Sequence, residues 1–319
     1  MSSRAKGCAV LFPGALGDFI CFLPTLLALR AEYQGRIVLA AAPAVLDLIC
    51  LDETSMLSIH GREISELFAP LPSPGSGAAA WLGSVTQVYS WTGFHDADFR
   101  RRLEEVTGRP ASLHPFRGMR AGEHAADYYA RCVGLLPRAI PPGVIRTDDD
   151  WVSALRSRRG FNRRPFLVVH PGSGSPKKNW QGFGALARNW QQQHDDAVVV
   201  LHGSAEREKR DAETRRQGDS RRLGDGLIVV EDLSLPQVAS LLRHSARYLG
   251  NDSGISHLAG AVGARGVVVF GPSDPVTWAP RSDGLRVMHA PEPCAQCGPE
   301  VFCVHRLSAE AVARAVAEV

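Results

Sequence analysis

The residues best suited to chemistry follow short apolar runs, and the clearest group is Asp252, Ser253 and Gly254. An apolar run ends at Leu249 just before them, and an alanine-rich helical segment follows, so we expect a strand, a tight turn and a helix. Aspartate and serine are good helix N-caps, and glycine lets a ligand approach the backbone closely. Because free N–H groups and the helix dipole suit a phosphate, the turn predicts an anion site. A capped structural helix is the alternative.

A second group lies in the loop at 170–180. The run Gly172, Ser173, Gly174 and Ser175 consists of small residues whose backbone N–H groups could bind phosphate, although an ordinary flexible loop is the alternative. The adjacent lysines at 177 and 178 close the loop, and they stand out because the chain has only four lysines.

A third group lies near the C-terminus and has the pattern C-x2-C-x5-C-x-H. Its members are Cys294, Cys297, Cys303 and His305. Three thiols and an imidazole suffice as zinc ligands, but free or redox-paired thiols are the alternative that we favour here. The odd total of seven cysteines fits a reducing compartment better than a disulfide scaffold.

The second half of the chain predicts a doubly wound parallel sheet. Strands are expected at 166–170, 197–202, 227–230 and 267–270, and a further strand is expected to end at Leu249. Helices are expected at 182–193, 205–217 and 235–243. Ligands bind at the carboxyl ends of the strands in such sheets. Three loops should therefore converge at one edge, namely 170–180, 203–206 and 251–254.

The first half shows a weaker alternation of the same kind. Strands are expected at 7–12, 36–42, 56–60 and 87–91, helices at 18–33 and 122–135, and a loop at 71–80. Pro137, Pro141, Pro142 and the acidic run 148–150 mark a boundary. We therefore predict two α/β domains, 1–145 and 146–319, of the kind that enclose a cleft.

Composition excludes several classes of protein. A hydrophobic content of 45% and a charged content of 22% are typical of a globular protein, and a net charge of +3 without a basic stripe argues against nucleic acid as a partner. No secretory leader and no apolar run of membrane-spanning length is present, so we expect a cytoplasmic protein. Five arginines at 156–164 predict a solvated linker face, with an anionic membrane surface as the alternative.

Four stretches, in order, resemble glycosyltransferase family 9, the ADP-heptose:lipopolysaccharide heptosyltransferases. They are PGALGDFICFLPTLLALR at 13–30, HPGSGSPKKNWQGFGALA at 170–187, DLSLPQVASLLRHS at 232–245 and NDSGISHLAGAVGARGVVVFGPSDPVTWAP at 251–280. Residues 50–150 match only in general character. The resemblance implies a GT-B architecture, two Rossmann-like domains facing across a cleft, with the acceptor in the first and the nucleotide sugar in the second.

The same resemblance implies an inverting transfer of heptose from ADP-heptose to a lipopolysaccharide core or related glycan. No cofactor beyond the nucleotide-sugar donor is expected, and the partners are that donor and a glycan or glycolipid acceptor, with peripheral contact to the inner membrane surface as an option. Two alternatives remain open: a GT-B sugar-nucleotide hydrolase or epimerase, and a non-catalytic nucleotide-sugar-binding module.

The resemblance also assigns roles to individual residues. Asp18 matches the proposed base, which takes the proton of the acceptor hydroxyl, and a helix N-cap is its alternative. Lys178 matches the lysine that neutralises the donor diphosphate. The remaining residues expected at the donor are Ser173, Gly174, Gly203, Glu206, Asp252, Ser253, Gly254, His257 and Asp274. Structural roles compete at three of these positions: a core histidine at 257, a surface helix start at 206 and a turn at 274.

Overall fold

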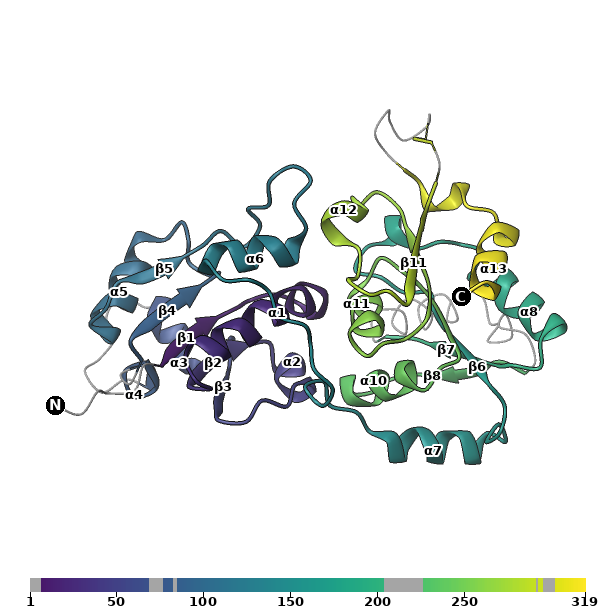
Figure 1. Cartoon of the computed structure of the whole chain (residues 1–319), viewed down its shortest axis with the longest axis horizontal. Coiled ribbons are helices and arrows are strands. Elements are labelled where there is room, and N and C mark those ends of the chain that lie inside the picture. Colours follow the sequence, from purple (N-terminus) through teal and green to yellow (C-terminus); the bar gives the residue numbers. More distant parts are fainter. Residues whose placement is uncertain (1–6, 69–76, 83–84, 204–225, 291, 295–301) are drawn as a thin grey trace, which may run out of the picture. The chain divides into compact units, whose positions relative to one another are not determined.

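The computed structural model of the chain describes residues 7–68, 77–82, 85–203, 226–290, 292–294 and 302–319 (Figure 1). The chain divides into two compact units, an N-terminal unit, Met1–Arg146, and a C-terminal unit, Thr147–Val319. Each unit is built around one parallel sheet with helices on both faces. The structure therefore confirms the α/β fold class that the alternation of strands and helices predicts.

The sheet of the N-terminal unit has the order β3-β2-β1-β4-β5, and every neighbouring pair is parallel. Its strands are β1 Cys8–Leu11, β2 Ile37–Ala41, β3 Thr54–Ser58, β4 Gln87–Ser90 and β5 Ala111–Leu113. The first strand lies in the centre, between β2 and β4, and all four of its residues are buried. Burial on both faces explains why its sequence is a continuous apolar run rather than an alternating one.

Helices cover both faces of this sheet. One core joins Leu11 of β1 to α3 Arg62–Ser65, α4 Gly77–Leu82 and α5 Ala97–Thr107. The other side carries α1 Leu16–Glu32, which packs against α6 Ala125–Val133, with α2 Pro43–Leu48 beside α1. Aromatic rings of Phe12, Phe22 and Tyr129 fill the contact between α1, α6 and the end of β1, and the Phe12 and Phe22 rings stack at 4.3 Å. The start of α1 is thereby held against the end of the central strand.

The sheet of the C-terminal unit has the order β11-β10-β9-β6-β7-β8, again parallel throughout. Its strands are β6 Phe166–His170, β7 Ala197–Leu201, β8 Ile228–Val230, β9 Arg247–Asn251, β10 Gly266–Phe270 and β11 Leu285–His289. This is the strand order of the Rossmann fold, whose ligand crevice lies where the order reverses. The reversal falls between the neighbouring strands β6 and β9.

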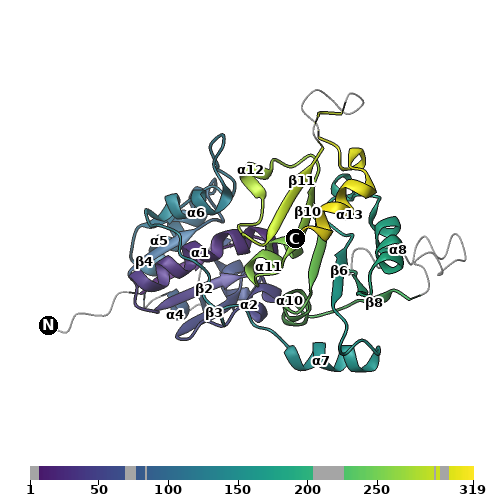
Figure 2. The same cartoon turned by 45° about the vertical axis from the view of Figure 1, so that its right-hand side comes forward.

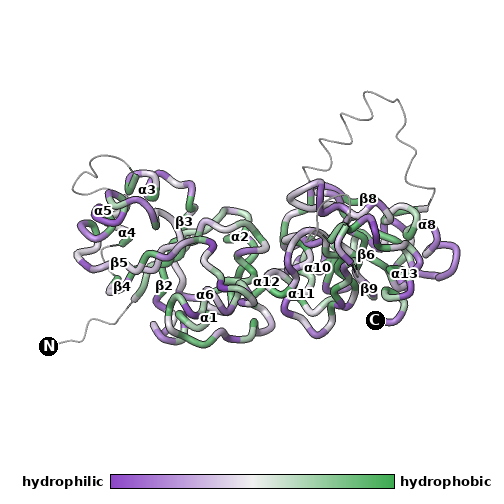
Figure 3. Tube along the Cα trace, turned by 90° about the horizontal axis from the view of Figure 1, so that it is seen from above, coloured by the Kyte–Doolittle hydropathy of each residue, from purple (hydrophilic) through white to green (hydrophobic). Residues whose placement is uncertain are grey.

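Two helix layers enclose this second sheet (Figure 2). The helices α8 Phe183–Gln193 and α13 Ala309–Ala317 share one core with Leu167, Val169 and Leu249 of the strands. Side chains alternate along a strand, so Tyr248 points to the opposite face, where its hydroxyl lies 2.8 Å from Ser256 Oγ of α11 Gly254–Ala261. The helix α10 Leu235–Arg243 packs beside α11, and α7 Asp149–Arg158 packs on α10. Figure 3 shows β6 as a hydrophobic stretch inside the unit.

The structure corrects the sequence-based predictions at several points. The loop expected at 71–80 is wrong for its last residues, because Gly77 begins α4, while residues 69–76 lie outside the described part of the chain. The helix expected at 205–217 also lies outside it. The predictions did not include α5, β5, β11 and α13. Two of these, β5 and β11, carry polar residues within short segments, so neither has the continuous apolar run by which the central strands were identified.

The close approach of β9 and β10 gives a test of this packing. A Cβ at Gly266 would lie 2.0 Å from the Tyr248 carbonyl oxygen, a backbone atom that cannot turn aside. Gly266→Ala should therefore lower the free energy of unfolding by about 2 kcal/mol or more, measured by urea unfolding with tryptophan fluorescence. The matched control is Gly184→Ala in α8, where the nearest group is the Arg188 guanidinium at 3.5 Å and stability should hold or rise slightly. Equal stability of the two variants would contradict the packing described.

Candidate active site

The candidate site lies at the carboxyl ends of β6 and β9, the neighbouring strands at which the order of the C-terminal sheet reverses. After β6 the chain forms the small-residue loop and the short 3-10 helix η2, Pro176–Lys178. After β9 it turns directly into α11, with Ser253 as N-cap. Two of the three loops predicted to converge are thus adjacent. The third follows β7, and its described part ends at Gly203.

The Asn251 side chain holds the two loops together. It is completely buried, its Oδ1 accepts a hydrogen bond from the Trp180 backbone N–H at 3.0 Å, and its Nδ2 donates to the Pro171 carbonyl at 2.7 Å. One amide therefore binds both ends of the loop that carries Lys178. The Trp180 indole N–H in turn donates to the Leu307 carbonyl at 3.0 Å, which ties the loop to the segment before α13.

Lys178 and Asp252 form an ion pair across the two loops. The Nζ–Oδ2 distance is 2.6 Å, and the exposed fractions of the two side chains are 30% and 6%. A carboxylate with so little exposure needs a partner, because an unpaired charge inside a protein is costly. Lys177, by contrast, is exposed, so the structure distinguishes two lysines that the sequence could not.

The start of α11 offers free backbone donors beside this ion pair. Ser253 caps the helix by accepting a hydrogen bond from the Ser256 N–H, and Ser256 Oγ donates to the Asn251 carbonyl at 2.5 Å. Burial raises the pKa of the neighbouring Tyr248 hydroxyl, so this group stays neutral. Within the described residues, the N–H groups of Gly254 and Ile255 have no acceptor. Such first-turn donors, with the helix dipole behind them, bind anions.

The other residues predicted at the donor differ in their surroundings. Ser173 Oγ lies 2.6 Å from Asn179 Oδ1 and 2.7 Å from the Ser175 carbonyl, so it stabilises its own loop. Gly174 is exposed, with open space where a Cβ would be. His257 is buried in α11 at 6% exposure, and Glu206 lies outside the described residues.

Asp274 has a structural role, although as a helix cap and not as the turn residue that was the alternative prediction. It is the N-cap of α12 Pro275–Trp278, accepting hydrogen bonds from the N–H groups of Val276 at 3.0 Å and Thr277 at 3.2 Å. The Thr277 hydroxyl also donates to it at 2.6 Å. These bonds, that of the Thr277 side chain first, lower the pKa of Asp274 and keep it ionised.

Asp18 lies in the N-terminal unit, in the first turn of α1. The N-cap of α1 is Ala15, so the alternative prediction of Asp18 as a helix N-cap is wrong. Arg117 approaches it, with 3.7 Å between Arg117 Nη2 and Asp18 Oδ1, and only 14% of the Asp18 side chain is exposed. The Arg117 guanidinium is thus within ion-pair distance of a carboxylate that could serve as a general base. The sequence did not single out Arg117, which lies 99 residues further along the chain.

Tyr129 of α6 adds an unusual group near Asp18. Its hydroxyl is buried without a hydrogen-bond partner among the described residues. Burial, and secondarily the negative charge of Asp18, raise the pKa of this hydroxyl. The Tyr129 hydroxyl is therefore a neutral potential donor beside the candidate base.

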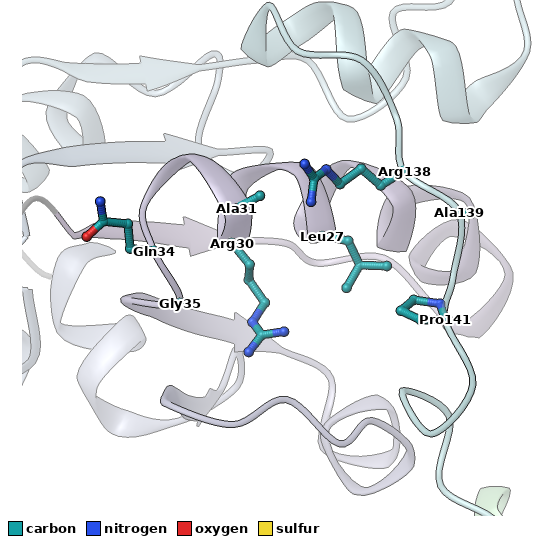
Figure 4. Close-up of a pocket in the computed structure, with 8 residues that line it drawn as sticks. All are labelled: Leu27, Arg30, Ala31, Gln34, Gly35, Arg138, Ala139 and Pro141. Atoms are coloured by element: carbon teal, nitrogen blue, oxygen red, sulfur yellow. The ribbon is translucent and has the colours of Figure 1, made fainter.

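A cavity of about 340 Å³ lies at the opposite end of α1 (Figure 4). It is lined by Leu27, Arg30, Ala31, Gln34, Gly35, Arg138, Ala139 and Pro141. One of its two arginines, Arg30, already donates to the Asp52 carbonyl at 2.7 Å. None of the lining residues is one of those that the sequence predicted for the site, so this cavity and Asp18 are separate features of the unit.

Two sequence predictions concern features outside the site. Cys294, Cys303 and His305 come together with their ligand atoms within 4.8 Å of one another, while Cys297 lies outside the described residues. In the arginine-rich segment, the Arg156 guanidinium donates to the Asn162 carbonyl at 2.7 Å and to the Arg164 carbonyl at 3.0 Å. Arg156 thus stabilises its own turn. None of the described helices combines the length and apolar character needed to cross a membrane.

Two Rossmann-type units in one chain are the components of the GT-B fold, and the comparisons with known proteins identify the family. The sequence profile of glycosyltransferase family 9 (heptosyltransferase) matches residues 138–302, more than half of the chain. The chain belongs to glycosyltransferase family 9 and is a glycosyltransferase, which confirms the family indicated by the four sequence stretches. No curated protein matches it.

Solved structures of a family 9 glycosyltransferase and of two heptosyltransferases have a similar fold. The family 9 glycosyltransferase from Veillonella parvula DSM 2008 has 19% sequence identity and a TM-score of 0.72, with 99% of each chain covered. The E. coli ADP-heptose lps heptosyltransferase II has 16% identity and a TM-score of 0.68, covering 98% of each chain. The E. coli heptosyltransferase WaaC with ADP has 17% identity and a TM-score of 0.60, covering 98% of this chain and 99% of the other.

The contacts of Asn251 predict a stability effect that involves no ligand. Asn251→Ala leaves the buried Trp180 N–H and the half-buried Pro171 carbonyl without their partner, so the free energy of urea unfolding should fall by about 2 kcal/mol. The control is Asn189→Ala on the exposed face of α8, which should change stability by less than about 0.5 kcal/mol. Similar stability of both variants would show that the amide does not hold the loop.

Proposed function

We propose that this protein is an inverting glycosyltransferase that moves heptose from ADP-heptose to a lipopolysaccharide-core or related glycan acceptor. In this proposal residues 146–319 bind the donor and residues 1–145 bind the acceptor. The observation that carries the proposal is the meeting of Lys178, Asp252 and the α11 N-terminus at the strand-order reversal of the C-terminal sheet. Family membership supports the reaction class, and the fold shared with an ADP-bound heptosyltransferase supports the choice of nucleotide.

The donor diphosphate would bind at the start of α11. The N–H groups of Gly254 and Ile255 would donate to its oxygens, and the Lys178 ammonium would neutralise the charge that develops as the nucleoside diphosphate leaves. Lys178 pairs with Asp252 in the structure, so a diphosphate would displace or share that partner. A freed Asp252 carboxylate could accept hydrogen bonds from sugar hydroxyls.

The acceptor hydroxyl would lose its proton to Asp18. As the proton moves to the Asp18 carboxylate, the oxygen attacks the anomeric carbon, and the bond from that carbon to the diphosphate oxygen breaks on the opposite side. This displacement inverts the configuration of the anomeric carbon. Arg117 has a positioning role in the proposal, because its guanidinium lies within ion-pair distance of the Asp18 carboxylate.

The donor can be tested with a thermal-shift panel of ADP, UDP, GDP and TDP, each with and without its sugar. Stabilisation by ADP and ADP-heptose above the others is the expected outcome, because a ligand that binds only the folded state raises the melting temperature. A preference for another nucleotide would overturn the choice of ADP-heptose. In a separate incubation of the protein with ADP-heptose and no acceptor, release of free sugar would indicate a hydrolase instead.

Asp18→Asn should separate catalysis from binding. The amide keeps the size of the side chain but accepts no proton, so we expect kcat for glycosyl transfer to fall by about 100-fold to 10,000-fold with nearly unchanged donor affinity. The matched control is Asp98→Asn in the first turn of α5, which should keep full activity. Full activity of Asp18→Asn, or an equal loss of donor affinity, would overturn the assignment of the base.

Lys178→Met should weaken ADP binding by about 10-fold to 100-fold, the range expected for a lost charge-assisted hydrogen bond. The exposed neighbour supplies the control, Lys177→Met, for which little change is expected. Isothermal titration calorimetry measures both affinities. Because Lys178→Met also leaves Asp252 unpaired, the double variant Lys178→Met/Asp252→Asn is needed: it should regain stability and still bind ADP weakly. Wild-type affinity in the double variant would contradict the role of the lysine.

A further inference from the structure

A cluster of metal-ligating side chains lies in the C-terminal unit, outside the residues given roles in sugar transfer. The ligand atoms of Cys294, Cys303 and His305 all lie within 4.8 Å of one another, and Cys294 Sγ is 3.8 Å from His305 Nε2. We propose that these three residues bind a zinc ion that has a structural role. Two thiolates and an imidazole are typical zinc ligands, and the remaining tetrahedral position accepts a fourth donor.

The spacing of the ligand atoms agrees with tetrahedral zinc. Bond lengths of about 2.3 Å for Zn–S and about 2.05 Å for Zn–N place a sulfur and a nitrogen about 3.6 Å apart at the tetrahedral angle, and two sulfurs about 3.8 Å apart. The observed 3.8 Å between Cys294 Sγ and His305 Nε2 is close to the value of about 3.6 Å expected for a sulfur and a nitrogen. The distances from Cys303 Sγ to the other two ligand atoms are at most 4.8 Å, so small movements would bring all three atoms to bonding distance of one ion. Ordinary side-chain rotation would complete the coordination.

The surrounding contacts hold the two ligand segments in place. Cys303 is the N-cap of the 3-10 helix η3 Val304–Arg306, which also carries His305. Arg306 of the same turn donates to the Pro293 carbonyl at 2.7 Å and lies 3.7 Å from the Glu292 carboxylate. Pro293 directly precedes Cys294, so Arg306 fixes the first ligand segment against the second. The ligands are preorganised by bonds that do not involve the thiols.

Burial and charge are both compatible with a bound metal ion. Cys294 and Cys303 are 4% and 8% exposed, whereas His305 is exposed. On binding zinc, each thiol releases one proton to solvent and forms a Zn–S bond, while neutral His305 donates its nitrogen lone pair. The two thiolate charges then balance the charge of the ion, so burial of the group carries no net charge.

A zinc ion here would stabilise the loop that carries Lys178. Val304 packs so closely on Gly271 that a Cβ there would lie 2.8 Å from Val304 Cγ1 and 3.6 Å from the Lys177 carbonyl oxygen. The Trp180 indole donates to the Leu307 carbonyl at 3.0 Å. Val304 lies between the ligands Cys303 and His305, and Leu307 follows His305 by two residues. This consequence for the donor loop rests on the proposed function, but the zinc site itself does not.

Elemental analysis of the full-length protein tests the site. The protein is produced in zinc-supplemented medium without a polyhistidine tag and measured by plasma mass spectrometry. We expect about one zinc per chain in the wild type and in the control Cys50→Ser, an exposed cysteine of the N-terminal unit. Cys303→Ser and His305→Ala should lose most of the metal. Because His305 is exposed, His305→Ala should keep the fold even if the cysteine variant does not.

Cobalt substitution tests the ligand types by spectroscopy, independently of the metal content. Co²⁺ bound in place of zinc should show thiolate-to-metal charge transfer and the strong visible bands of tetrahedral coordination, and the bands should change in His305→Ala. A wild type without metal, an unchanged metal content in both variants, or iron in place of zinc would overturn the proposal. ADP affinity after removal of the metal by a chelator tests only the proposed effect of zinc on the donor loop. An unchanged affinity would contradict that effect, whereas the zinc content tests the zinc site whether or not the proposed function holds.

Discussion

The candidate donor site depends on one buried amide. Asn251 ends the strand β9, and its side chain bonds to both ends of the loop that follows the neighbouring strand β6. These two bonds fix the loop against the end of β9, the strand that leads into α11, and the Trp180 indole and the Lys178–Asp252 ion pair add further bonds. Since a buried amide that loses its partners costs about 1–3 kcal/mol per group, the arrangement is strongly specified.

The two units use the same part of a Rossmann-type sheet. Asp18 follows the first strand of one sheet, and Lys178 follows the first strand of the other. In each case the first strand is central, and the chain order reverses beside it, which leaves room above the strand ends for a ligand. The fold thus positions a carboxylate in one unit and an ammonium in the other by the same topological rule.

Sequence patterns were sufficient for the strands with continuous apolar runs and for the capped start of α11. The central strands β6 and β10 are continuous apolar runs, and Ser253 was recognised as a cap by residue type alone. The Lys178–Asp252 pair and the approach of Arg117 to Asp18 could not be predicted, because they join residues far apart in the chain through contacts with no sequence period. Asn251 was overlooked because a polar residue at a strand end is ordinarily read as the start of a loop. A buried asparagine directly after an apolar strand was the available signal.

The Lys178–Asp252 pair means that these two charges of the candidate donor site balance each other before any ligand binds. In the proposed function a diphosphate therefore replaces one anionic partner of the lysine by another, and binding is an exchange. The affinity measured for a nucleotide would then reflect the difference in free energy between the lysine–phosphate and the lysine–aspartate ion pairs. It would therefore be lower than the strength of the lysine–phosphate contact alone. In the proposed reaction the same exchange would favour product release, because Asp252 can pair with Lys178 again as the nucleoside diphosphate departs.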